Sequence, residues 1–146
     1  MALVGGGGAG NTIGGSNPAG TSQGLNFVRV PTMPFDLCYA NSGVVVTLTG
    51  SADTTTLSFN TGQASIEGRF YFGVHETTQD NLEFTLLFND QVVYGTEYSL
   101  GSTAQKHTPN FIDTVIPPDT AITVIVVDRS SGTIDTTTTF SGRAYA

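Results

Sequence analysis

The stretch NLEFTLLFND (residues 81–90), followed by QVVYGTEYSL (91–100), decides the fold class. Every second residue of 82–88 is large and apolar, and a β-strand places alternate side chains on one face. Asn89 and Asp90 then predict a tight turn, because both residue types tolerate positive φ. The two stretches therefore predict a β-hairpin with one buried face.

The same period of two continues in both directions from this hairpin. Turn residues recur about every 8–12 residues, and no sustained apolar period of 3.6 interrupts the pattern. Further strands are predicted within the ranges 25–30, 33–40, 43–50, 51–62, 65–75, 110–118, 120–130 and 134–146. This pattern predicts an all-β fold, an antiparallel β-sandwich of jelly-roll type with eight or nine strands. An immunoglobulin-like sandwich is the second choice, although the chain lacks the Cys…Trp…Cys core of that fold.

Residues 1–24 differ in composition from the rest of the chain. They contain nine of the 18 glycines and no charged side chain, so they have little to bury and much backbone entropy to lose. A phosphate-binding loop would need a strand before it, a helix after it or a GK[ST] step, and the sequence contains none of these. We therefore divide the chain into an extended glycine-rich N-terminal arm (1–24) and a jelly-roll domain (25–146). The arm is expected to become ordered on a partner through Leu3, Val4, Gly5, Gly6, Gly7, Gly8, Asn11 and Ile13.

Charge and hydropathy exclude several classes of protein. The formal net charge is −7 and only five residues are Lys or Arg, too few to neutralise a nucleic-acid backbone, so direct nucleic-acid binding is not expected. No apolar run approaches the ~18 residues of a membrane-spanning helix. The N-terminal residues lack the basic and apolar regions of a signal peptide, so none is expected.

Residues able to carry catalysis or bind metal are sparse. The single cysteine, Cys38, rules out an intrachain disulfide and a multi-cysteine zinc site, and it is expected to be a small buried apolar residue. His75 and His107 are the two histidines, and no nucleophile motif accompanies them. We therefore predict no catalytic residues, no cofactor and no metal site, and a protein that is not an enzyme. A calcium ion bound by the Asp-containing turns remains a lesser alternative.

The segment ITVIVV (122–127) departs from the usual alternation. Ile125 and Val127 make its second face largely apolar as well, so that face is covered either within the fold or by a neighbouring subunit. Ile125 and Val127, together with Tyr145, are the predicted residues of an oligomer interface.

Three stretches carry a resemblance to a known family: FTLLFNDQVVYGTEYSL, FIDTVIPPDTAITVIVVD and TTTTFSGRAYA. They resemble the C-terminal half of jelly-roll heads of the tumour necrosis factor and complement-globular type. The last strand in those heads carries an aromatic-Ser-Gly step similar to Phe140-Ser141-Gly142. Such heads are usually trimers, so the resemblance implies a homotrimer.

The overall plan of the chain is similar to that of the decoration, cement or minor capsid proteins of phages and other viruses. An acidic jelly roll with a Gly-, Ser-, Asn- and Thr-rich arm and no catalytic set is typical of them. The resemblance implies a structural protein of the virion surface, made in the host cytoplasm, whose partner is the major capsid protein or another virion protein. A carbohydrate- or receptor-binding module of a fibre or surface assembly is the alternative.

Overall fold

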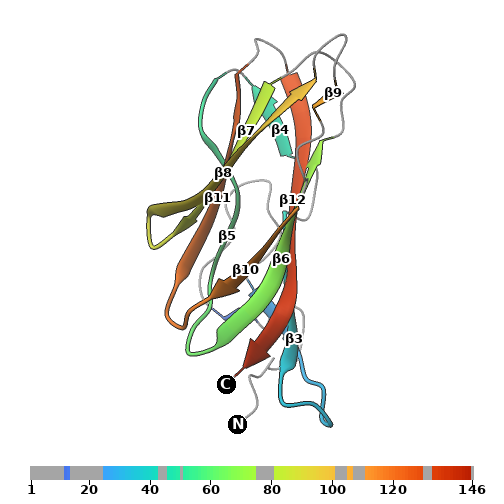
Figure 1. Ribbon diagram of the computed structural model, residues 1–146, viewed down its shortest axis with the longest axis vertical. Helices are drawn as coiled ribbons and strands as arrows, with labels where there is room; N and C mark the ends of the chain where they lie inside the picture. The colour runs from blue at the N-terminus through green and yellow to red at the C-terminus, as the bar shows by residue number, and fades with distance from the viewer. Residues whose placement is uncertain are drawn as a thin grey trace.

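The computed structural model describes residues 12–13, 25–42, 46–49, 51–74, 81–100, 105–106, 111–129 and 133–145. The described chain forms two antiparallel sheets that pack face to face (Figure 1). Sheet A contains β1 (Thr12–Ile13), β2 (Leu25–Val28), β3 (Asp36–Asn41), β4 (Val46–Thr49), β6 (Ser65–Val74), β10 (Phe111–Ile116) and β12 (Thr133–Tyr145). Sheet B contains β5 (Thr54–Asn60), β7 (Asn81–Phe88), β8 (Gln91–Leu100), β9 (Gln105–Lys106) and β11 (Ala121–Asp128).

Eight of these strands make a jelly roll. Their orders are β3-β12-β6-β10 in sheet A and β5-β11-β7-β8 in sheet B. Among the links between consecutive members of this set, only the β7–β8 hairpin stays within one sheet, and every other link crosses to the opposite sheet. The predicted all-β sandwich of jelly-roll type is therefore confirmed.

The β7–β8 hairpin has the turn that the sequence predicts. Asn89 and Asp90 have φ values of 48° and 63°, which is the left-handed pair of a two-residue hairpin turn. Asn89 also fixes the hairpin to β11, because its Oδ1 accepts a hydrogen bond from the backbone N–H of Ala121 at 2.8 Å. The turn therefore sets the β7–β8 register and also contacts the start of β11, the strand on the other side of β7.

Four short strands lie outside the eight jelly-roll strands, and two of them, β2 and β4, fall within the predicted ranges 25–30 and 43–50. β2 and β4 flank the jelly-roll strands of sheet A, whereas β1 and β9 contain only two residues each. β9 lies between the predicted strand ranges 91–100 and 110–118, and β1 lies in the predicted arm, where Ile13 pairs with Leu25. Such short pairings come from backbone groups at a sheet edge, so hydropathy patterns do not reveal them.

The space between the sheets is filled by the apolar positions that the alternation predicts. Four fully buried phenylalanines, Phe59, Phe70, Phe84 and Phe140, are the largest side chains of this core. Cys38 is also buried, as predicted, and desolvation, with a smaller contribution from Asp36, raises the pKa of its thiol to about 12. A thiol in this state is a packing group rather than a nucleophile.

Two glycines let Phe140 lie flat in this core. Gly68 and Gly142 are Cα partners on β6 and β12, and both occupy inward-facing positions. A Cβ at Gly68 would come within 2.5 Å of the Phe140 ring. The ring instead lies with its centroid 4.6 Å from that of Phe70 and 5.2 Å from that of Phe59. The missing side chains therefore create the space that the aromatic core uses.

The core also contains a buried polar contact between the sheets. The hydroxyl oxygens of Thr56 on β5 and Thr138 on β12 lie 2.8 Å apart, and both residues are fully buried. Because a buried hydroxyl without a partner is costly, this hydrogen bond favours one alignment of the two sheets.

Candidate functional site

The outward face of the four-stranded part of sheet A is the candidate site. Side chains at alternate positions of β3, β12, β6 and β10 point away from the core there, in rows set by the strand register. One row contains Tyr39, Ser141, Arg69 and Asp113, and the next contains Leu37, Arg143, Glu67 and Val115. We define the sheet A face as these eight residues together with Tyr71 and Phe111.

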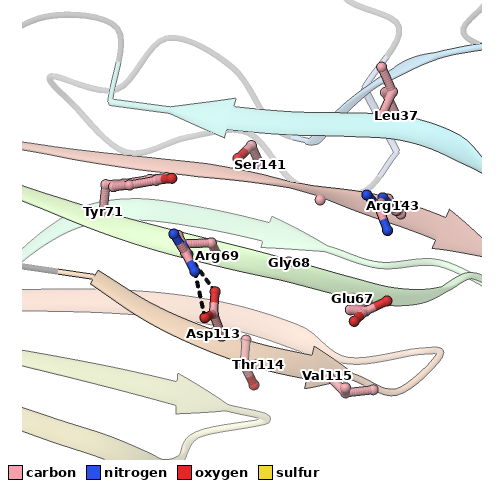
Figure 2. Close-up of a pocket in the computed structure, with 11 residues that line it drawn as sticks. Leu37, Glu67, Gly68, Arg69, Tyr71, Asp113, Thr114, Val115, Ser141 and Arg143 are labelled. Atoms are coloured by element: carbon pink, nitrogen blue, oxygen red, sulfur yellow. Dashed lines mark hydrogen bonds and ion pairs between the residues drawn. The ribbon is translucent and has the colours of Figure 1, made fainter.

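A hollow of about 640 Å³ opens in the middle of the sheet A face. Its floor lies at Ser141 and at the backbone of Gly68 and Gly142, where side chains are small or absent. Larger side chains of the same face form the rim, as Figure 2 shows: Leu37, Glu67, Arg69, Tyr71, Asp113, Val115 and Arg143. The hollow thus combines apolar, aromatic and charged groups around a small polar centre.

Arg69 and Asp113 form a two-pronged ion pair at the rim of the hollow (Figure 2). Nε of Arg69 donates to Oδ1 of Asp113 at 2.5 Å, and Nη2 donates to Oδ2 at 2.7 Å. The guanidinium also lies over the ring of Phe111, with Cζ 4.2 Å from the ring centroid. These contacts fix the orientation of both charges, although both side chains remain exposed to solvent.

Hydrogen bonding within this pair shifts both acid–base equilibria. The bonds from Arg69 are the main cause that lowers the pKa of the Asp113 carboxyl below its ordinary value of 3.8. The bond to Asp113, followed by one to Tyr71, raises the pKa of Arg69. Both groups are therefore charged throughout the neutral range, and neither changes its protonation state there.

We expect the Asp113 carboxyl to titrate below pH 3.8 in the folded protein, measured by NMR of its carboxyl carbon. Because folding lowers this pKa, the stabilising contribution of the pair is present above the ordinary pKa and is lost as pH falls through the folded value. Arg69→Gln should return the midpoint to the ordinary range. An unchanged midpoint in that variant would show that Arg69 is not the cause of the shift.

A second group of contacts lies at the C-terminal end of β12, beside the hollow. The ring of Tyr145 meets that of Phe35 edge-on, with centroids 5.8 Å apart, and its hydroxyl lies 3.5 Å from Oε2 of Glu67. Arg143 lies over the same Phe35 ring, with Cζ 5.2 Å from its centroid. Tyr145, one of the predicted interface residues, therefore borders the sheet A face.

The other two predicted interface residues lie on the outward face of sheet B. Ile125 is half-buried between Thr55 of β5 and Thr85 of β7. Val127 lies beside Glu83 and is only 3% exposed, so this chain already covers it. The structure thus separates the three residues: Tyr145 lies on one sheet, and Ile125 and Val127 lie on the other. Their role in an interface remains a prediction.

Most of the predicted partner-binding residues of the arm lie outside the described residues. This applies to Leu3, Val4, Gly5, Gly6, Gly7, Gly8 and Asn11, and also to both histidines, His75 and His107. Ile13 is described as part of β1, and its backbone pairs with β2 of the same chain. Within the described ranges, no three His, Cys, Asp or Glu side chains come together as a metal site requires. No helix in those ranges is long and apolar enough to cross a membrane.

The sequence of β6 alone does not reveal the sheet A face. Alternation within 65–75 places Glu67, Arg69 and Tyr71 opposite the apolar positions, which is typical of the solvated side of a strand. The available signal was FIDTVI (111–116), where Phe111 and Val115 alternate with the inward-facing Ile112 and Ile116. A strand that is apolar on both faces, as ITVIVV is, indicates that its second face is also a contact surface.

Comparison with known proteins does not assign a family to the chain. No protein-family model matches it, and no curated protein matches it. Among solved structures it is similar to the insecticidal delta-endotoxin Cry8Ea1 from Bacillus thuringiensis, at 10% sequence identity and a TM-score of 0.40. The match covers 68% of this chain and 19% of that chain, so it spans about a fifth of the toxin. A similarity at this TM-score assigns neither a family nor a function.

Proposed function

We propose that the protein is a non-enzymatic structural protein of a virion: a capsid decoration, cement or minor capsid protein that binds the major capsid shell. The observation that carries this proposal is the sheet A face, an aromatic and apolar surface on a rigid jelly roll. Two of its four charged residues, Arg69 and Asp113, are held in an ion pair. Such a surface suits assembly with other protein chains.

The proposed mechanism divides the work between the arm and the head. Residues 1–24 tether the protein to the shell through backbone hydrogen bonds, and the head supplies contacts between copies, most simply in a homotrimer. The same kind of backbone pairing occurs within this chain, where β1 adds to the edge of sheet A through β2. Tethering then raises the effective concentration of each head at the shell.

Deletion of residues 1–24 is expected to reduce attachment to the virus particle by at least about tenfold, because the backbone contacts of the tether are lost. Co-sedimentation of the purified protein with particles that lack it measures this. Replacement of Gly5–Gly8 by four serines is the matched control, since it keeps the length and the backbone groups. Attachment that survives the deletion would remove the arm from the mechanism.

A carbohydrate- or receptor-binding module is the second candidate, and the hollow is the observation that favours it. Tyr71 and Ser141 line it, and an aromatic ring beside a hydroxyl group suits a sugar. Binding of the full chain to a glycan array, together with loss of binding in Tyr71→Ala, would favour this candidate over the capsid role.

A further inference from the structure

We propose that the sheet A face is the surface through which two copies of this chain bind each other. This inference rests on the part of the proposed function in which the head assembles with copies of itself, and it names the residues that do so. It does not depend on a virus particle. The occupant of the face is a second copy of the same chain.

The distribution of exposed apolar side chains is the first argument. Nine large apolar side chains are exposed in the described residues, and six of them lie on the outward side of sheet A: Val28, Leu37, Tyr39, Tyr71, Phe111 and Val115. Val28 joins the set because it is the Cα partner of Leu37 and so extends the same row. Isolated exposed apolar residues are ordinary, but a concentration on one face of one sheet indicates a protein contact.

Charge explains why the occupant is a second copy. The chain has a net charge of −7, so two copies repel each other over most of their surfaces. The sheet A face is an exception, because its four charged residues balance: Arg69 and Arg143 against Glu67 and Asp113. It therefore contains two of the five basic residues of the chain, and an acidic partner can approach it without net repulsion.

Among the described residues, sheet B has two exposed large apolar side chains, Val92 and Val93 on β8, against six on sheet A. Glu83 and Glu97 are Cα partners on the outward face of sheet B, and Arg129 pairs with Glu83 at 2.8 Å, which leaves this group with a negative balance. Val127 on the same face is already covered. Of the three predicted interface residues, only Tyr145 borders the sheet A face, with its exposed apolar side chains and its balanced charge.

The anchors of the sheet A face are held in place before any contact forms. Tyr71 and Phe111 are Cα partners with ring centroids 6.3 Å apart, and Arg69 lies over the Phe111 ring. Aromatic side chains fixed on strands lose little conformational entropy on binding, which favours association. The hollow at Ser141 adds a recess that a side chain of the second copy can enter.

Val115→Lys tests the proposal, with Val92→Lys as its matched control. Both are strand valines with similar exposure, 69% and 65%, but Val115 lies on the sheet A face and Val92 lies on β8 of sheet B. Sedimentation velocity should show an oligomer for the full-length protein at tens of micromolar. Val115→Lys should weaken association by at least about tenfold, because it places a charge inside an apolar contact. Val92→Lys should behave like the unmodified protein.

Other outcomes overturn the proposal, each in a different way. An oligomer that survives both Val115→Lys and Tyr71→Glu uses another surface, although the proposed structural function remains. A monomeric unmodified protein removes self-association altogether. If that monomer nevertheless binds particles, and Val115→Lys abolishes this, then the face binds a shell protein instead of a second copy. Deletion of residues 1–24 should leave the oligomer intact, which separates this test from that of the arm.

Discussion

Phe140→Ala is expected to destabilise the protein by about 3–5 kcal/mol, the usual cost of removing a buried phenylalanine ring. Phe140 is 1% exposed and contacts Phe59 and Phe70 at the centre of the sandwich. The cavity cannot close easily, because Gly68 beneath the ring has no side chain to fill it. Since domains are stable by only about 5–15 kcal/mol, this change removes a large part of the total. Urea unfolding followed by circular dichroism measures it.

Two control variants show whether the loss of unfolding free energy in Phe140→Ala comes from the core. Phe140→Leu keeps an apolar side chain of similar reach, so it should lose less than half as much as the alanine variant. Val92→Ala truncates a side chain that is exposed on β8 and should change the free energy of unfolding by less than about 0.5 kcal/mol. Equal stability of Phe140→Ala and Val92→Ala would place Phe140 outside the core.

The strands and the hairpin could be predicted because their signals are local. The period of two in 82–88 depends only on residues within one strand, and the Asn89-Asp90 turn depends on two residues. The strand of 122–127, which is largely apolar on both faces, could likewise be recognised from its own composition. The step from strands to a jelly roll drew on regular turn spacing, and the sheet orders confirm it.

The candidate site could not be predicted in the same way, because it exists only between strands. Tyr71 and Phe111 are 40 positions apart in the sequence, and the register of β6 and β10 makes them neighbours. Arg69 and Asp113 become an ion pair through the same register. Each residue alone fits the solvated face of a sheet, so only the pairing of strands shows that they form one surface.

The two inward-facing glycines show the same dependence on strand pairing. The resemblance to tumour necrosis factor-type heads drew attention to Phe140-Ser141-Gly142, but it gave no reason for the glycine. The reason lies on the neighbouring strand, where Glu67 and Gly68 approach Gly142 too closely for a side chain. A glycine within a strand usually weakens it, so its presence here indicates a close approach of two backbones.

Gly142→Ala is therefore expected to destabilise the protein by about 1–3 kcal/mol, as overpacking of a core does. An added Cβ would lie 2.7 Å from the carbonyl oxygen of Glu67 and 3.0 Å from the Cα of Gly68. Both are backbone atoms of β6, so relief requires β6 and β12 to separate along a register of ten residue pairs. Thermal and urea unfolding of the variant measure the loss.

Gly95→Ala is the matched control, because it adds the same methyl group to another strand glycine. The nearest atom to its Cβ would be the carbonyl oxygen of Phe84 at 4.0 Å, which is an ordinary van der Waals contact. Alanine also restricts the unfolded chain more than glycine does, and Gly95→Ala should be neutral or stabilise the protein by up to about 1 kcal/mol. Gly68→Ala should cost at least as much as Gly142→Ala, because its Cβ would lie 2.7 Å from the carbonyl oxygen of Ser141 and 2.5 Å from the Phe140 ring. Phe140→Ala removes only the clash with the ring in a double variant. The closest clashes of Gly142→Ala are with backbone atoms, so no second side-chain substitution can remove them. A Gly142→Ala protein as stable as the unmodified one would refute the close pairing of β6 and β12.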